Sequence, residues 1–296
     1  MNADARSSRS PIRKKLLGEY AISAPSLAWL IFFFLLPTLI IFAIAFRSKG
    51  AYGGIGDSWT LTTLAELRNP DYPAIIWRTV WMSVVCTLAT LAIAVPVAYH
   101  IARVSQWKRD LLLLLTIIPF WTNLLIRIFA WRLVLHPQGM LRNLFLSLHL
   151  IDPTTVFLGN PVAVLVVMIY TELPFAILPI YAAAEKFDFA LFEAAMDLGA
   201  GRLYAFFHVF LPGIREGLMS ACLMIFIPLI GSYVIPDLVG GKDSQMIGNV
   251  IVRLALEQRN LPAAAAMSTV MFLIMSLPLL YYLKTTTDKH AQEVAK

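Results

Sequence analysis

Charged side chains inside otherwise apolar stretches are the residues of this sequence best placed to do chemistry. Glu172 is the only charged residue between positions 161 and 184. At a rise of about 1.5 Å per residue it lies roughly 18 Å along a helix that starts at position 161, near the middle of a bilayer. Charge at that depth is costly and usually marks a transport pathway or a pair. A carboxylate there can attract an ammonium group; the alternative is that it pairs with a residue on another helix and only fixes packing.

Arg127 and Asp237 are two further candidates for a pathway. Arg127 and Arg132 fall roughly 24 and 32 Å along a second apolar stretch. Arg132 therefore reaches the outer interface, where a long cationic side chain extends to water. For Arg127 a role in solute passage stands beside an ion pair with a partner subunit or with Asp237. Asp237 precedes two glycines, so it is either an acidic lip over an outer mouth or a cap for a loop.

Aromatic rings in the same stretches can surround an organic cation through cation–π contacts. In membrane proteins such rings serve more often as interfacial belts or as packing. Both readings stay open for the candidates Trp121, Tyr170 and Tyr233.

Recognisable catalytic and metal-binding patterns are not found in the sequence. The five histidines are scattered without metal-ligand spacing, and Cys86 and Cys222 form no CxxC pair. The run at Gly240 ends like a phosphate loop, but Asp243 follows the lysine where serine or threonine is needed. We therefore expect no catalytic residue, no metal site and no cofactor bound by this chain.

The elements that must hold these candidates are helices in lipid. The chain of 296 residues is 59% hydrophobic and 14% charged, with a mean hydropathy of +0.72, whereas ordinary soluble domains have about 25% charged residues. Six apolar stretches each reach the roughly 20 residues that a membrane-spanning helix needs. The sequence thus predicts an all-α membrane protein with six transmembrane helices, over residues 20–46, 79–102, 111–135, 161–184, 217–236 and 260–283.

The distribution of lysine and arginine predicts that both termini are cytoplasmic. Short loops rich in these residues stay inside. With the N-terminus inside, fourteen of the 24 basic residues fall on the cytoplasmic side and eight on the outer side. The net charge of +6 is then explained by the anionic cytoplasmic leaflet, so we expect no nucleic-acid partner. The expected domains are a cytoplasmic segment 1–19, a six-helix membrane domain 20–284 and a cytoplasmic tail 285–296.

Two outer segments are predicted to be ordered. Residues 51–57 contain three glycines and read as a flexible turn, followed by a short surface helix over 61–67. In residues 240–257, apolar side chains recur at helical spacing, which predicts an amphipathic helix on the outer face of the membrane.

The predicted cytoplasmic loop 185–216 is unusually aromatic and indicates a helix, a break and a second helix. Asp188 can cap the first helix, Gly199 and Gly201 can end it, and the second runs over residues 202–210. Such an elbow suits a groove on a soluble partner; the alternative is a helix lying on the lipid headgroups. The side chains it would present are Phe189, Leu191, Phe192, Ala195, Leu203, Tyr204 and Phe207, with the acids Glu193 and Asp197 alongside.

The same loop resembles the EAA motif of ABC importer permeases. The matching residues are Glu193, Ala194, Ala195, Gly199, Val209, Leu211 and Pro212. Valine stands where the motif usually has isoleucine, which keeps a branched apolar side chain. Residues 118–135, 139–145 and 237–251 in addition resemble permeases of the spermidine/putrescine type.

This resemblance implies a type I ABC importer permease fold in a bacterial inner membrane, with the elbow as a cytoplasmic coupling helix. The implied partners are a second permease in a heterodimer, two copies of an ATPase that binds ATP and magnesium, and a periplasmic solute-binding protein. The chain itself would be a translocation subunit and not an enzyme. Its residues in contact with the ATPase would be Glu193, Ala194, Ala195 and Gly199, with Leu211 and Pro212 completing the motif.

The expected activity is import of a small organic solute from the periplasm, with a polyamine such as putrescine or spermidine as the leading candidate. An opine or an amino-acid-like solute is the alternative within the same class. An ion-coupled secondary carrier or a membrane-embedded enzyme fits less well, because neither accounts for the EAA spacing.

Overall fold

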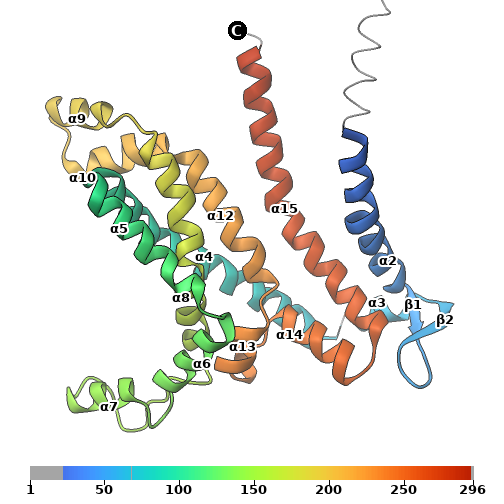
Figure 1. Cartoon of the computed structure of the whole chain (residues 1–296). Coiled ribbons are helices and arrows are strands. Elements are labelled where there is room, and N and C mark those ends of the chain that lie inside the picture. The colour runs from blue at the N-terminus through green and yellow to red at the C-terminus, as the bar shows by residue number, and fades with distance from the viewer. Residues whose placement is uncertain (1–22, 68, 295–296) are drawn as a thin grey trace, which may run out of the picture.

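The computed structural model describes residues 23–67 and 69–294, and this part of the chain is mostly helical (Figure 1). The basic segment 1–19 and the first three residues of the first predicted span lie outside the described residues. The elements in chain order are the first helix Ser23–Ile44, with η1 (Ile31–Leu35) and α2 (Leu36–Ile44), then β1 (Arg47–Lys49), β2 (Ile55–Trp59), α3 (Thr62–Glu66), α4 (Asp71–Arg103), α5 (Gln106–Ile117), η2 (Ile118–Trp121), α6 (Leu124–Val134), α7 (Met140–Ser147), α8 (Pro161–Glu185), α9 (Phe189–Asp197), α10 (Arg202–Ala205), η3 (Phe206–Phe210), α11 (Leu211–Gly213), α12 (Arg215–Ile230), α13 (Val234–Val239), η4 (Lys242–Ser244), α14 (Ile247–Val252), η5 (Arg253–Glu257) and α15 (Leu261–Val294).

Four helices are long and apolar enough to cross a bilayer unaided: the first helix, α4, α8 and residues 261–282 of α15. Two further spans are bent. The segment 106–121 meets α6 at 93°, and the segment 202–213 meets α12 at 74°. The described chain is therefore an all-α membrane fold of up to six spans. The antiparallel hairpin of β1 and β2 is a small addition outside the helices.

The third predicted span, 111–135, is wrong as a single straight helix. Pro119 lies in the short η2 turn, and the chain is extended at Thr122 and Asn123. The side chain of Asn123 then accepts a hydrogen bond from the N–H of Leu125 at 2.8 Å and starts α6 as an N-cap. The apolar run continues through this break, so hydropathy alone does not reveal it.

Three other boundaries differ from the prediction. The fifth helix ends at Ile230, after which the short α13 holds the last predicted residues of that span, because Gly231 and the extended φ at Tyr233 interrupt it. Helix α4 starts at Asp71, eight residues before the predicted start at 79. This acid lies in the first turn of the helix, where its negative charge interacts favourably with the helix dipole. Helix α15 continues to Val294, so most of the predicted tail 285–296 is helical.

The core lies between α4, α8 and α12. Small and hydroxyl side chains line the buried face of α4, and such residues let membrane helices approach closely. On α12 the buried Gly217 lies against Ala183 of α8. The buried face of α4 consists of Thr79, Met82, Ser83, Cys86, Thr87, Thr90, Ala94, Val95, Ala98 and Ile101.

The elbow and the chain ends occupy one end of the molecule. In Figure 1, α9, α10, the last turns of α15 and the start of the first helix point to the top, whereas α7, α13, α14 and the hairpin lie at the bottom. The first helix packs along α15 and leaves large apolar side chains exposed over its length. A surface of this kind belongs in lipid or against another subunit.

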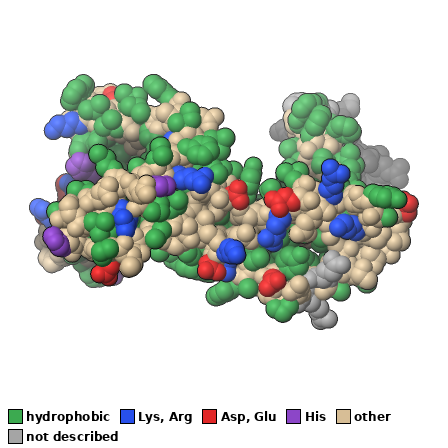
Figure 2. All heavy atoms as spheres, turned by 90° about the horizontal axis from the view of Figure 1, so that it is seen from below, with side chains coloured by type: hydrophobic (Ala, Val, Ile, Leu, Met, Phe, Trp, Pro, Cys, Tyr) green, Lys and Arg blue, Asp and Glu red, His purple; other side chains and the backbone are tan. Residues whose placement is uncertain are grey.

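Acidic, basic and apolar side chains are interspersed on the end opposite the elbow (Figure 2). A turn is present at Gly53 and Gly54, which both have a positive φ, but residues 55–57 of the predicted turn belong to strand β2. Helix α3 confirms the predicted short helix over 61–67. The amphipathic helix predicted within 240–257 is present as α14 and η5, yet Val250 and Leu254 pack against α15 and not on the membrane surface.

Candidate functional site

The first arm of the elbow is α9, which starts and ends where the sequence predicts. Asp188 Oδ1 accepts a hydrogen bond from the N–H of Ala190 at 3.0 Å. At the other end Gly199 has a φ of +91°, and the Gly199 and Ala200 amides donate to the carbonyls of Met196 and Ala195 at 2.9 and 3.0 Å. This is the Schellman arrangement, which favours glycine at its left-handed position. Gly201 has an ordinary φ of −66° and is not required for the break.

The second arm is longer than the sequence predicts. It runs from Arg202 to Gly213 through a π-helical turn, and Pro212 lies within its last short helix. Proline is tolerated there because it stands at the first turn of that helix. The sharp bend, 74°, follows at Ile214 before α12 begins. The predicted end of this helix at Phe210 is thus three residues early, which is about one turn.

The two arms divide their apolar side chains between the core and the surface. Phe192 is buried, and Phe189 and Ala195 pack against the core, so these three predicted contact residues face inward. Leu198 and Leu203 are 89% and 76% exposed. Large apolar side chains left this open at the end of a membrane protein indicate a missing partner. The outward set is Leu191, Leu198, Leu203, Tyr204 and Phe207.

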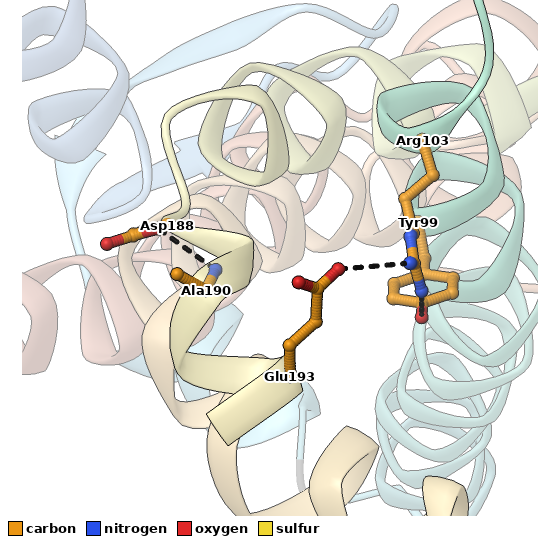
Figure 3. Close-up of polar contacts among 5 residues, drawn as sticks. All are labelled: Tyr99, Arg103, Asp188, Ala190 and Glu193. Atoms are coloured by element: carbon orange, nitrogen blue, oxygen red, sulfur yellow. Dashed lines mark hydrogen bonds and ion pairs between the residues drawn. The ribbon is translucent and has the colours of Figure 1, made fainter. Parts of the chain in front are cut away.

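Two residues at the end of α4 hold the elbow in place. The Tyr99 ring lies between the arms, with its centroid 4.9 Å from Phe210 and 5.9 Å from Phe192. One turn later, the Arg103 guanidinium lies 4.0 Å from a carboxylate oxygen of Glu193 (Figure 3). Neither residue was singled out from the sequence. The available signal was an aromatic and a cation four residues apart at the cytoplasmic end of a span, one helical turn from each other.

Glu172 and Arg127 come from different helices and act on one another. Glu172 lies on α8 with only 8% of its surface exposed. Arg127, on α6, is a charged group that interacts with it electrostatically. The Arg127 guanidinium also lies 5.7 Å from the Phe120 ring, and its Nε and Nη1 atoms are buried without a hydrogen-bond partner among the described residues. The ion pairs found among the described residues are Arg103–Glu193 and Arg109–Glu185, so Arg127 forms an ion pair with neither Asp237 nor Glu172.

The aromatic candidates do not form one cage. Trp121 is largely exposed on η2. Tyr170 packs edge-on against Trp131, with ring centroids 5.5 Å apart. Tyr233 instead stands beside Asp237 in a separate cavity near α13.

That cavity has a volume of about 250 Å³ and is polar. Asp237 lies within α13 and is not a flexible lip. Gln245, Arg253 and Glu257, which the sequence did not single out, come from the loop before α14 and from η5. Arg253 Nη1 donates to Gln245 Oε1 at 3.3 Å. The lining residues are Tyr233, Asp237, Gln245, Asn249, Val252, Arg253 and Glu257.

Metal chemistry has no evident place in the described part of the chain, where no three His, Cys, Asp or Glu side chains come together. The molecule offers instead an exposed elbow at one end, a buried acid beside a cation in the middle and a polar cavity toward the other end.

The fold is that of an ABC importer permease. A crystal structure of a bacterial ABC transporter involved in the import of the acidic polysaccharide alginate matches 93% of this chain and 96% of that chain, with a TM-score of 0.69 at 19% identity. The crystal structure of the bacterial alginate ABC transporter in complex with alginate pentasaccharide-bound periplasmic protein matches 91% of this chain and 93% of that chain. Its TM-score is 0.67 and its sequence identity is 18%.

Sequence comparison gives the family. The family described as binding-protein-dependent transport system inner membrane component matches residues 91–284. The spermidine/putrescine transport system permease proteins PotB of Haemophilus influenzae and Escherichia coli (strain K12) are 35% and 36% identical over 86% of this chain, covering 89% and 92% of those proteins. The inner membrane ABC transporter permease protein YdcU of E. coli is 31% identical over 75% of this chain and 74% of its own length. The chain therefore belongs to this family of inner-membrane permeases, which confirms the resemblance of its EAA spacing.

Proposed function

We propose that this chain forms half of the passage of an ATP-driven importer for polyamines, carrying them from the periplasm to the cytoplasm. The main observation behind this proposal is a sequence identity of about a third to permeases named for spermidine and putrescine. This similarity extends over 86% of the chain. A buried acid in the membrane and two carboxylates around the polar cavity suit an organic cation. An opine or amino-acid-like solute remains the alternative within the same importer class.

The exposed elbow is the proposed docking surface for the ATPase, which binds ATP and magnesium. Its outward apolar residues fit a groove, and the stiff break at Gly199 holds the two arms at an angle. Closure of two ATPase copies would pull on the elbow and rock the helices around a central site. Glu193, Ala194 and Ala195 of α9, with Leu211 and Pro212 of α11, belong to this coupling unit.

The arrangement in Figure 1 supports a cytoplasmic location for both termini, because the start of the described first helix, the last turns of α15 and the elbow share one end of the molecule. The opposite end would then meet the periplasmic solute-binding protein. The first helix and α6 both expose apolar side chains that can contact a second permease. Solute would then pass between two unlike subunits.

Within the passage, Glu172 and Arg127 are the proposed inner charged residues, and Asp237 and Tyr233 line the proposed outer site. Among the described residues, neither the Asp237 carboxylate nor the Glu257 carboxylate forms a hydrogen bond or an ion pair, and the cation that lines the same cavity, Arg253, instead donates to Gln245. An ammonium group can therefore enter the cavity without displacing an existing pair. Trp121 and Tyr170, which lie apart from both places, contribute at most to the walls.

The test is uptake by proteoliposomes that contain this chain with its second permease, ATPase and binding protein. Labelled putrescine, spermidine and a neutral amino acid are offered in parallel, with and without ATP. We expect saturable, ATP-dependent polyamine uptake. Uptake of only the other solute would retain the importer and discard the polyamine, and failure to assemble with any ATPase would overturn the importer itself.

A further inference from the structure

Arg103 makes four contacts at the junction of α4 and the elbow, three of them with the elbow. Arg103 is the last residue of α4, and its Nη1 donates a hydrogen bond of 2.6 Å to the hydroxyl of Tyr99 one turn earlier. Its guanidinium also lies 5.5 Å from the Phe189 ring and 5.8 Å from the Phe192 ring. The fourth contact is the ion pair with Glu193 (Figure 3). Arginine suits this place because its planar head stacks on rings while it binds a carboxylate.

The three contacts that Arg103 makes with the elbow, to Phe189, Phe192 and Glu193, fall on one face of α9. Phe189, Phe192 and Glu193 are spaced by three and four residues, so they share that face. The arginine therefore holds the first arm as a unit. Glu193 itself remains 63% exposed, so the carboxylate is held at the edge of the elbow, where a docked subunit can also reach it.

A cavity lies beside these contacts and makes them more important for holding the elbow against α4. A cavity of about 500 Å³ separates the arms of the elbow from the end of α4. Tyr99 and Arg103 are the residues of α4 that line this cavity, and both contact the elbow. Its lining also includes Phe192, Met196, Arg202, Leu203 and Phe206.

Movement delivered to α4 reaches the centre of the molecule. Helix α4 packs along α8, which carries Glu172, and along α12. The buried face of α4, which is rich in small residues, packs closely against its neighbours and leaves α4 little room to slide past them. A closely packed interface therefore transmits a displacement of α4 to the neighbouring helices. The contacts made by Arg103, the last residue of α4, are thus well placed to couple the elbow to the passage.

We propose that Arg103 is a positioning residue that couples the elbow to α4, and that Glu193 acts through its pair with Arg103. The inference rests on the proposed function, because it assigns a route by which the ATPase moves the helices. It makes Glu193, the acid of the EAA spacing, an internal contact of the permease as well as a neighbour of the ATPase.

The test measures solute imported per ATP hydrolysed in the assembled complex for Arg103→Gln, Glu193→Gln and the double variant. We expect each single variant to lower this ratio about fivefold, and the double variant to lower it no further than the worse single one. Multiplying effects would show that the two residues act independently and would overturn the proposal. Normal coupling in Arg103→Gln would overturn it too.

Arg109→Gln is the matched control, because Arg109 forms the other ion pair, with Glu185 at 2.9 Å, and is not among the Arg103 contacts. Its ratio should equal that of the unaltered complex; an equal loss would point to general charge effects and against a special tie. If Arg103→Gln does not assemble, Arg103→Lys, which retains the charge, takes its place in the cycle. Absence of ATP-dependent uptake in the unaltered complex would instead mark failure of the proposed function.

Discussion

Gly217 on α12 lies so close to Ala183 on α8 that a Cβ at Gly217 would stand 2.3 Å from the Cβ of Ala183. It would also stand 2.9 Å from the carbonyl oxygen of Pro179. We expect Gly217→Val to push the helices apart and to destabilise the permease by about 2 kcal/mol. The thermal midpoint of the detergent-solubilised protein measures this. Gly201→Ala is the control, since a Cβ there meets nothing within 4 Å; equal midpoints for the two variants would contradict the close contact.

A second long-range contact joins α4 to the start of α14. The hydroxyl of Thr79 accepts a hydrogen bond of 2.9 Å from the N–H of Ile247 and donates one of 2.8 Å to the carbonyl of Ile75. Because Ile247 is buried, Thr79→Val leaves its amide without a partner, at a cost of about 1–3 kcal/mol. We expect a lower thermal midpoint. Ser276→Ala, which removes an exposed hydroxyl, should leave the midpoint unchanged, and a similar fall in both variants would argue against the Ile247 contact.

Much of the fold can be predicted from the lengths of the apolar stretches, but the breaks in the helices cannot. The run at 161–184 contains one charge and appears as one helix, α8, within a residue of the prediction. The break at Asn123 depends on a side-chain cap that competes with helix continuation, and hydropathy does not register it. Helix α15 extends beyond 284 because polar residues can continue a helix after lipid ends. Sequence therefore predicts which segments are buried in the membrane better than where each helix stops.

The candidate site was predictable where local chemistry decides it. Asp188 and Gly199 act as cap and break because both roles depend on neighbouring backbone. The inward position of Phe192 depends on Tyr99, nearly a hundred residues earlier in the chain, so the sequence could not show which face of α9 is buried. Likewise, the proximity of Glu172 and Arg127 depends on how two helices rotate against one another, which periodicity leaves open.

Gly199 offers a test of elbow geometry. Its φ of +91° is strained for any other residue, although a Cβ there meets nothing within 4 Å. We expect Gly199→Val to strain the break by about 1–2 kcal/mol and to uncouple ATP hydrolysis from uptake. Gly201→Ala again serves as the control, because its φ is ordinary. Normal coupled uptake by the valine variant would show that the angle between the arms is not needed.

The outward face of the elbow predicts how the ATPase is held. Leu203 is 76% exposed, and an aspartate in its place would have to enter an apolar groove without a partner. We expect Leu203→Asp to reduce co-purification of the ATPase at least tenfold, about 1.4 kcal/mol of binding free energy. Leu256→Asp, at a site 74% exposed on the other end of the molecule, should co-purify normally. Retention of the ATPase by both variants would exclude Leu203 from the contact.

Glu172 separates a role in solute passage from a role in packing. Its carboxylate is buried within α8 beside the charge of Arg127, and either an ammonium group or that guanidinium can be its partner. If the carboxylate attracts the solute, Glu172→Gln should lower kcat/KM for polyamine uptake about tenfold, a loss of about 1.4 kcal/mol, in a complex with an unchanged thermal midpoint. Glu185→Gln removes the same charge from the cytoplasmic end of α8 and should transport normally. A fall in the midpoint of Glu172→Gln matching its loss of uptake would assign the acid to packing with Arg127, and undiminished uptake would remove Glu172 from the passage.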